Sequence, residues 1–260
     1  MNVEDVFISI IDEALAEDLF TATIDFNIEL ALFSLPHILE DPHLDAIIQK
    51  VNHVLSQHSI RKALHGPVVD LYYDSRDSKV RKIAWERILK GLSIAEELGA
   101  EIMVVHSTFN PLFRASKKYP EAWVARSITF WNEMAQIAEE KKITVVLENI
   151  FDEEPTLIKE VIRGVNSSYF KACIDTGHIN IFSKVSSEKW VSVLGNDLAY
   201  LHIHNNSGII DEHNGVQNGT FDFPLFFRAV KDNRLNPICT LELRRIEDIE
   251  PSKKILAKLL

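Results

Sequence analysis

Three histidines and an aspartate fall between residues 201 and 213, directly after an apolar run. The run at residues 199–204 predicts a strand, and alternate side chains of a strand share one face, here Tyr200, His202 and His204. Imidazole and carboxylate groups together suit Zn, Mn or Fe, whereas Ca and Mg favour oxygen ligands. The stretch therefore predicts a metal site, with a polar loop of solvated histidines as the alternative for this stretch alone.

Similar side chains stand at the ends of other apolar runs. In chain order they are His65, His106, Glu148, Asp175 with His178 three residues on, His202 with Asp211 and His213 in the following loop, and Glu242. Any one of them alone could be an ordinary core or surface residue. Glu148 and Glu242 follow strongly apolar runs, however, and an unpaired buried carboxylate costs several kcal/mol. The repetition of such residues at six run ends predicts a metal centre.

The elements that must position these residues alternate along the chain. Apolar runs predict strands over residues 6–11, 28–35, 60–64, 101–106, 143–148, 170–175, 199–204 and 237–243. Helical spacing of apolar residues predicts helices over residues 15–26, 44–57, 80–98, 121–139, 156–165, 187–194, 223–231 and 251–260. Strands separated by helices imply right-handed crossovers and a parallel sheet.

Eight strand–helix units predict a closed (β/α)8 TIM barrel, built by residues 1–260 as a single domain. An open doubly wound sheet is the alternative, but no glycine-rich phosphate-binding motif follows the first predicted strand. In a TIM barrel the active site is formed by the C-terminal ends of the strands. The candidate ligands stand at those ends.

Composition narrows the class of protein. Hydrophobic residues make up 46% and charged residues 25%, which is ordinary for a compact soluble domain. The net charge of −10 argues against unspecific attraction to nucleic acid or to an anionic membrane. Cys173 and Cys239 lie in apolar runs and are predicted to be buried thiols. With no secretory signal pattern and no long apolar run, we expect a cytoplasmic protein without a membrane partner.

Basic residues near the predicted mouth of the barrel are candidates for holding an anionic group of a substrate. Arg114, Lys117 and Lys118 follow the fourth predicted strand, and Arg244 lies two residues beyond Glu242. Arginine binds phosphate or carboxylate through two parallel hydrogen bonds. The alternative for each of these residues is a solvated surface charge.

Eight short motifs from about residue 60 onward together resemble the xylose isomerase-like TIM-barrel superfamily. They are His65-Gly66-Pro67, Val104-Val105-His106, Leu147-Glu148-Asn149, Ile174-Asp175-Thr176-Gly177-His178, Leu201-His202-Ile203-His204-Asn205, Asp211-Glu212-His213, Gly219-Thr220-Phe221-Asp222-Phe223 and Leu241-Glu242-Leu243. This superfamily includes sugar and sugar phosphate isomerases and epimerases and the endonuclease IV group.

The resemblance implies a cofactor of one to three divalent ions, Zn²⁺ or Mn²⁺. In the isomerase and epimerase branch it implies one metal held by Glu148, Asp175, His202 and Glu242. In the endonuclease IV branch it implies three zinc ions sharing nine ligands, which adds His65, His106, His178, Asp211 and His213. All of these residues are present in the chain.

Our leading hypothesis is a metal-dependent isomerase or epimerase acting on a sugar, a sugar phosphate or a sugar-derived acid. The metal would stabilise a developing enediolate while Glu148 and Glu242 remove and return the proton. His178 is a further catalytic candidate. His65, His106 and Arg244 are candidates for binding the substrate.

Three alternatives remain: an endonuclease IV-type phosphodiesterase acting on abasic DNA, a lyase or dehydratase of the same superfamily, and a non-catalytic metal-binding barrel. The loops at residues 11–14 and 34–41 are short and acidic, whereas affinity for DNA depends on Lys and Arg contacts to phosphates. We therefore expect a small carbohydrate as the partner rather than DNA.

Overall fold

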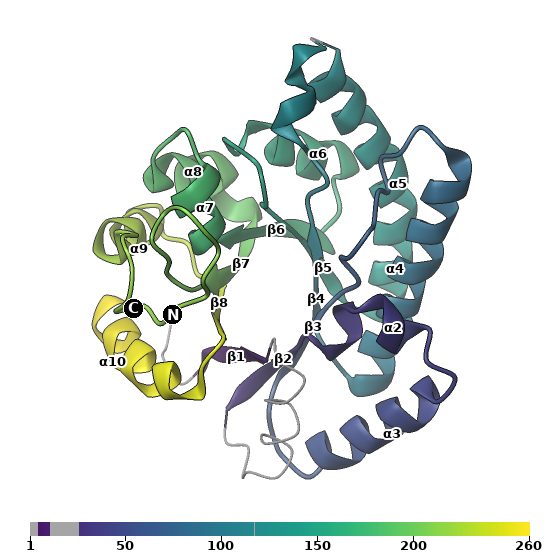
Figure 1. The fold of residues 1–260 in the computed structure, drawn as a ribbon, viewed down its shortest axis with the longest axis horizontal. Helices are drawn as coiled ribbons and strands as arrows, with labels where there is room; N and C mark the ends of the chain where they lie inside the picture. Colours follow the sequence, from purple (N-terminus) through teal and green to yellow (C-terminus); the bar gives the residue numbers. More distant parts are fainter. Residues whose placement is uncertain (1–4, 11–25, 117) are drawn as a thin grey trace.

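The computed structural model describes residues 5–10, 26–116 and 118–260, and eight parallel strands close into a barrel in chain order (Figure 1). The closure joins β1 to β8, with Phe7 opposite Thr240. The strands are β1 Phe7–Ile10, β2 Asn27–Leu30, β3 Lys62–His65, β4 Ile102–His106, β5 Thr144–Glu148, β6 Phe170–Asp175, β7 Leu198–Ile203 and β8 Ile238–Leu243. The predicted (β/α)8 TIM barrel is confirmed.

The helices form a ring outside the strands (Figure 1). They are α2 Pro36–Leu39, α3 Leu44–Leu55, α4 Ser78–Leu98, α5 Tyr119–Lys141, α6 Thr156–Val165, α7 Thr176–Phe182, α8 Ser187–Leu194, α9 Phe223–Asp232 and α10 Ile249–Leu259. Short 3-10 turns, η2 Leu32–Ser34, η3 Pro111–Ala115, η4 Gly195–Asp197 and η5 Ile246–Asp248, lie in the connections. The helix predicted at residues 15–26 and the loop at residues 11–14 lie outside the described residues, apart from residue 26.

Local sequence signals fix the ends of the long helices. The Asp77 side chain accepts a hydrogen bond from Lys79 N at 2.8 Å at the start of α4. Gly99 ends the same helix with φ of 67°, a left-handed conformation that glycine adopts at little cost. The predicted end of the helix at residues 80–98, before Gly99, is confirmed, and its observed start at Ser78 is two residues earlier.

The apolar core has two parts. The larger lies between the strands and the helices and includes the fully buried rings of Trp123, Trp131 and Trp190. The smaller fills the inside of the barrel, with Phe7, Ala63, Ile102, Val104, Val146, Cys173 and Tyr200. Both cysteines are buried, as predicted. No helix among the described residues is long and apolar enough to span a membrane.

The structure differs from the prediction at the end of β2 and at α7. The second strand ends at Leu30 rather than at residue 35, because Ala31 adopts a helical backbone and Pro36 begins α2, where its missing N–H is no disadvantage. The helix α7 was not predicted. It is only seven residues long and depends on the side chain of Asp175, which caps it by accepting a hydrogen bond from His178 N.

The barrel interior gives the first testable prediction. Val146→Asp places a charge in the fully buried interior cluster, and Lys171, opposite it on β6, is already paired with Asp197, so we expect a loss of several kcal/mol in the free energy of unfolding. Val69→Asp, on a partly exposed loop position, is the matched control and should change stability by under about 0.5 kcal/mol. Urea unfolding followed by circular dichroism measures both. Equal stability of the two variants would contradict the placement of Val146.

Candidate metal centre

Four candidate ligands from four strands meet at the C-terminal end of the barrel. Glu148 ends β5, Asp175 ends β6, His202 lies on β7 and Glu242 on β8, and one ligand atom of each lies within 4.8 Å of the others. His202 is central, because its Nδ1 atom lies 3.3 Å from Glu148 Oε2 and 3.2 Å from Glu242 Oε2. All four side chains are buried. The structure thus brings together the set that the resemblance implies for a single-metal site.

A second group shares Glu148. Nε2 of His65 at the end of β3 and Nε2 of His106 at the end of β4 lie 3.8 Å and 3.5 Å from Glu148 Oε2. The strand register accounts for this arrangement, since His106 and Glu148 are opposite each other in the β4–β5 pair. The two imidazole rings meet edge to face with their centroids 5.0 Å apart. Both residues predicted to bind substrate or metal here are therefore at the site.

A third group surrounds Asp211 in the loop after β7. Its Oδ2 atom lies 3.4 Å from His178 Nε2 and 2.8 Å from His213 Nε2. The group is joined to the first, because His178 Nδ1 lies 3.3 Å from Glu148 Oε1. All nine residues of the larger predicted ligand set therefore belong to one connected cluster.

Backbone carbonyl groups orient three of the histidine rings. A carbonyl oxygen only accepts, so the facing ring nitrogen must donate, and the other ring nitrogen is turned toward the carboxylates of the cluster. Such an arrangement around histidine is typical of metal ligands. The pairs are His65 Nδ1 with Gly66 O at 3.2 Å, His178 Nδ1 with Asn149 O at 3.0 Å, and His213 Nδ1 with Glu242 O at 3.2 Å.

Glu29 on β2 orients His202 in the same way, and the sequence analysis missed it. Its fully buried carboxylate lies 3.0 Å from His202 Nε2, and it accepts hydrogen bonds from Tyr200 Oη at 2.8 Å and Ser9 Oγ at 2.9 Å. The ring therefore donates from Nε2 and turns Nδ1 toward the candidate ligands. The available signal was a glutamate inside an apolar strand, where an unpaired carboxylate would be costly.

His204 is a second missed residue, although it lies in the stretch that predicted the site. It is fully buried, its Nε2 atom lies 3.0 Å from Asp175 Oδ2, and its ring stacks on that of His213 with centroids 3.9 Å apart. A Cβ atom on Gly177 would overlap His204 Cε1, so only glycine leaves room for the ring. His204 therefore fixes Asp175, and with His213 and Glu242 it forms a further possible set of ligands.

Asn149 holds the backbone of Asp175. Its side-chain oxygen accepts from Asp175 N at 2.9 Å, and its amide donates to Asp175 O at 3.2 Å. The residue is fully buried beside Glu148. A paired backbone leaves the Asp175 carboxylate as the only part of that residue free to face the cluster and cap α7.

Close packing of charges shifts the pKa values of the cluster. Burial opposes ionisation of Glu148, but the nearby rings of His202 and His106 outweigh burial and hold the pKa of this carboxyl well below its usual range. The same balance lowers the pKa of Glu242. Burial lowers the pKa of His202, but the surrounding carboxylates, Glu242 first, raise it well above the ordinary value. In His106 burial wins, and the pKa falls to about 4.

The residues fit a divalent metal ion. Among the described residues, Glu148 Oε2, His202 Nδ1, His204 Nδ1 and Asp211 Oδ1 are buried atoms without a hydrogen-bond partner. Leaving such atoms unpaired costs free energy, whereas a cation would satisfy carboxylate and imidazole lone pairs together. The mixture of oxygen and nitrogen donors suits Zn²⁺ or Mn²⁺ better than Ca²⁺ or Mg²⁺.

The basic residues near the mouth are less closely associated with the cluster. The guanidinium of Arg114 pairs with Glu153, so its charge is already used between the loops after β4 and β5. Lys117 lies outside the described residues, and Lys118 is exposed. Arg244 is exposed directly after β8, and its role in substrate binding stays a prediction.

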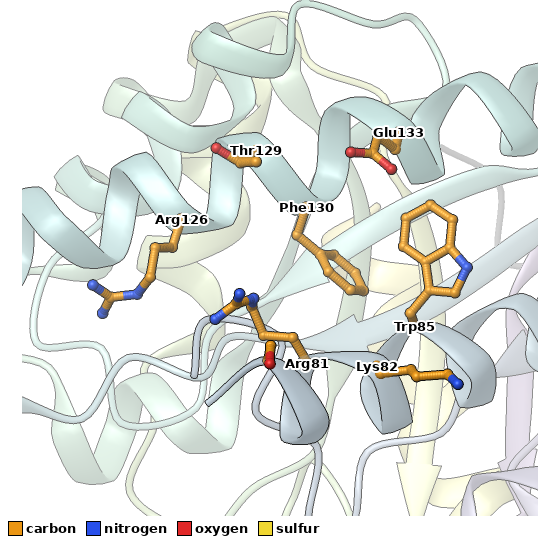
Figure 2. Close-up of a pocket in the computed structure, with 8 residues that line it drawn as sticks. Arg81, Lys82, Trp85, Arg126, Thr129, Phe130 and Glu133 are labelled. Carbon is orange, nitrogen blue, oxygen red and sulfur yellow. The ribbon is translucent and has the colours of Figure 1, made fainter. Parts of the chain in front are cut away.

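A groove of about 440 Å³ lies elsewhere, on the outer surface between α4 and α5 (Figure 2). Figure 2 shows the rings of Trp85 and Phe130 facing the groove, with Arg81 and Arg126 to one side of them. Both arginines donate hydrogen bonds to backbone carbonyls of the loop before α4. No candidate ligand lines this groove, so it is separate from the metal centre.

A family model described as a xylose isomerase-like TIM barrel matches residues 27–259. The chain belongs to this family. The matched segment contains Glu29, His204 and all nine residues of the predicted ligand set. The family suspected from the motifs is therefore confirmed.

The chain is similar to two uncharacterized proteins of Methanocaldococcus jannaschii. MJ1311 is 26% identical over 212 residues, covering 78% of this chain and 71% of the relative. MJ1614 is 26% identical over 199 residues, covering 74% of this chain and 75% of the relative. The names of these two relatives state no activity.

Several solved structures share the fold. A D-tagatose 3-epimerase-like protein has a TM-score of 0.81 at 24% identity, covering 98% of this chain and 96% of its own. The TTHB071 protein from Thermus thermophilus, soaked with ZnCl2, has a TM-score of 0.79 at 24% identity, with coverage of 98% and 97%. An L-ribulose 3-epimerase has a TM-score of 0.72 at 17% identity, with coverage of 98% and 85%. At these identities the likeness establishes the barrel fold.

The geometry predicts that the purified chain binds at least one divalent ion. Titration of metal-free protein with Zn²⁺ or Mn²⁺ should raise the thermal unfolding midpoint, since a free ligand at 100 times its Kd stabilises by about 2.7 kcal/mol. His202→Gln should lose this stabilisation, while His43→Gln, an exposed position on the outer surface, should keep it. Elemental analysis gives the stoichiometry. Protein that takes up none of Zn, Mn, Co or Fe would contradict the assignment.

Proposed function

We propose that the chain is a metal-dependent sugar isomerase or epimerase that moves a proton between carbon atoms of a sugar, a sugar phosphate or a sugar-derived acid. The observation that carries the proposal is the pair Glu148 and Glu242, which approach His202 Nδ1 from β5 and β8. The names of three solved neighbours, D-tagatose 3-epimerase-like protein, D-allulose 3-epimerase and L-ribulose 3-epimerase, agree with this class of reaction.

The two glutamates are suited to opposite halves of a proton transfer. Both carboxyl groups have lowered pKa values, so both are ionised near neutral pH and either can accept a proton. Since they belong to strands that are not neighbours in the barrel, they can face a bound substrate from different directions. One glutamate would remove the proton, and the other, once protonated from solvent or from a substrate hydroxyl, would deliver a proton to the opposite face and invert the carbon centre. Return of the removed proton to an adjacent carbon by the first glutamate would isomerise the sugar.

The residues of the cluster would also hold the metal ion and orient the substrate. Glu148, Asp175, His202 and Glu242 would hold the metal. A bound divalent cation supplies Lewis-acid polarisation of a carbonyl oxygen, which makes the neighbouring C–H more acidic. His65, His106 and His178 border the same space and would form hydrogen bonds with substrate hydroxyls or move a proton between oxygen atoms. A lyase or dehydratase would share the first proton removal and differ in the group that leaves afterwards.

Substitution of either glutamate tests the proposal. Incubation of metal-loaded protein in D2O with a panel of ketopentoses and ketohexoses should exchange one carbon-bound proton for deuterium, visible by proton NMR. Glu148→Gln and Glu242→Gln should each slow the exchange by about 10²–10⁴-fold, because the amide cannot act as a base.

Two controls accompany this test. Glu247→Gln, at an exposed position in η5, should exchange at the wild-type rate. Circular dichroism of the two site variants should match the wild type, since both positions are at the catalytic face rather than in the apolar core. Full activity of folded Glu242→Gln would contradict the assigned role.

A phosphodiesterase acting on abasic DNA is the second candidate, because the group around Asp211 is assembled in addition to the single-metal set. Closely spaced metal ions suit phosphate ester hydrolysis. Against this candidate stands the net charge of −10. DNA contacts would need a local basic surface able to overcome that charge.

A DNA duplex carrying an abasic site distinguishes the isomerase from the phosphodiesterase. We expect metal-loaded protein to show neither incision of a duplex carrying an abasic site nor binding to it that depends on salt. Fluorescence anisotropy at several salt concentrations measures the slope, which would be about −0.9 per phosphate contact for a DNA-binding protein. Steep salt dependence with cleavage at the lesion would favour the nuclease.

A further inference from the structure

Exposed apolar side chains are concentrated on the face of the barrel that carries the metal centre. Apart from Ile83 on α4, every large apolar side chain that the described residues expose lies between the end of a strand and the next helix. These residues are Val69, Tyr72, Leu112, Phe113, Phe151, Ile209, Ile210 and Ile246. Single exposed apolar residues are normal on a soluble protein, but a grouping around a site marks a binding surface.

Five of these residues form what we term the apolar crescent, and three loops contribute them. The exposed fractions are 85% for Leu112, 60% for Phe113, 45% for Phe151, 78% for Ile209 and 62% for Ile210. Such exposure leaves much of each side chain in contact with solvent. The crescent therefore offers a large apolar area for a ligand to cover.

Side-chain contacts show that the three loops adjoin one another. The ion pair between Arg114 and Glu153 joins the loop that carries Leu112 and Phe113 to the loop that carries Phe151. Phe151 packs edge to face on Phe182 of α7, with ring centroids 5.1 Å apart. The amide of Asn180, also on α7, donates to Asn206 O at 3.3 Å at the start of the loop that carries Ile209 and Ile210. The loops that carry the crescent, after β4, β5 and β7, are therefore linked to one another directly or through α7.

The crescent also borders the metal centre. The ring of Phe182 lies 6.5 Å from that of His178, measured between centroids. Ile210 directly precedes Asp211, whose Oδ2 atom lies 3.4 Å from His178 Nε2. A ligand whose polar end reaches His178 would therefore pass over apolar side chains as it leaves the site.

We propose that the substrate of this site carries a bulky apolar substituent that lies on the apolar crescent while its sugar-like part enters the metal centre. The inference rests on the proposed function and specifies its substrate class. A free sugar would leave the crescent exposed to water, whereas an alkyl or aryl group attached to the sugar would bury it. A second copy of the chain seated on the crescent would cover the adjoining site, and the acidic chain would be repelled by an anionic bilayer.

Alkyl glycosides of increasing length test the inference without requiring turnover. The probes are n-hexyl, n-heptyl and n-octyl β-D-glucoside, each below its micellar concentration, titrated by calorimetry into metal-loaded protein. We expect Kd to fall with each added methylene, by up to about fourfold when the methylene is fully buried. Binding that does not change with chain length overturns the inference.

Variants locate the effect on the surface. Leu112→Ser with Phe113→Ser, and separately Ile209→Ser with Ile210→Ser, should remove most of the dependence on chain length. Ile83→Ser is the matched control, since Ile83 is an exposed apolar residue on α4, away from the strand-end loops, and this variant should keep the full dependence. All substituted side chains are exposed, so folding should be unaffected. Equal loss in the control would overturn the inference.

Two further measurements test whether a second copy of the chain covers the crescent and whether the proposed function holds by itself. Sedimentation velocity showing a dimer that dissociates in the crescent variants, but not in Ile83→Ser, would identify the crescent as an interface between copies and overturn the inference. Deuterium exchange into unsubstituted ketoses tests the proposed function by itself. Deuterium exchange together with binding that does not depend on alkyl chain length would support the proposed function and overturn the inference of an apolar substituent. Binding that depends on chain length, without exchange on any ketose or alkyl ketoside, would overturn the proposed function.

Discussion

The contact between Glu29 and His202 connects the packing of the barrel to the chemistry at its mouth. Both side chains are fully buried, and Nε2 of His202 lies 3.0 Å from Oε2 of Glu29. Two buried groups of this kind are stable only when the remaining lone pairs and protons are satisfied. Tyr200 and Ser9 donate hydrogen bonds to the Glu29 carboxylate, and the candidate ligands Glu148 and Glu242 face Nδ1 of the His202 ring. Removal of Glu29 would leave the ring free to turn away from the ligands.

The register of a parallel barrel places the site residues at one level. Strand pairing sets His106 opposite Glu148 and Asp175 opposite His202, so residues far apart in the chain reach the same layer. Apolar side chains such as Phe7 and Val146 fill the layer beneath and exclude water. The strands thus supply most of the candidate ligands, while the segments beyond them add His178, Asp211, His213 and the apolar crescent.

Much of the fold and of the site could be predicted because the signals are local. Strand ends such as His106 and Glu148 follow runs rich in β-branched residues, and the position of a strand end in a barrel determines which face its side chain reaches. The helix at residues 156–165 was predicted at its observed bounds for a similar reason, since its apolar spacing is regular. The end of β2 and the helix α7 were missed, because short elements depend on capping and turns more than on periodicity.

Residue types and their spacing along the chain were enough to establish the repeating strand–helix order, the ligand-type residues at the strand ends and the family. Barrel closure was needed to show that Glu29 orients His202, that His204 packs against the small Gly177 and holds Asp175, and that Arg114 is paired within the loops. The contacts of Glu29 alone join residues 20 to 173 positions apart. Such partners are chosen by three-dimensional packing, which leaves no pattern in the local sequence.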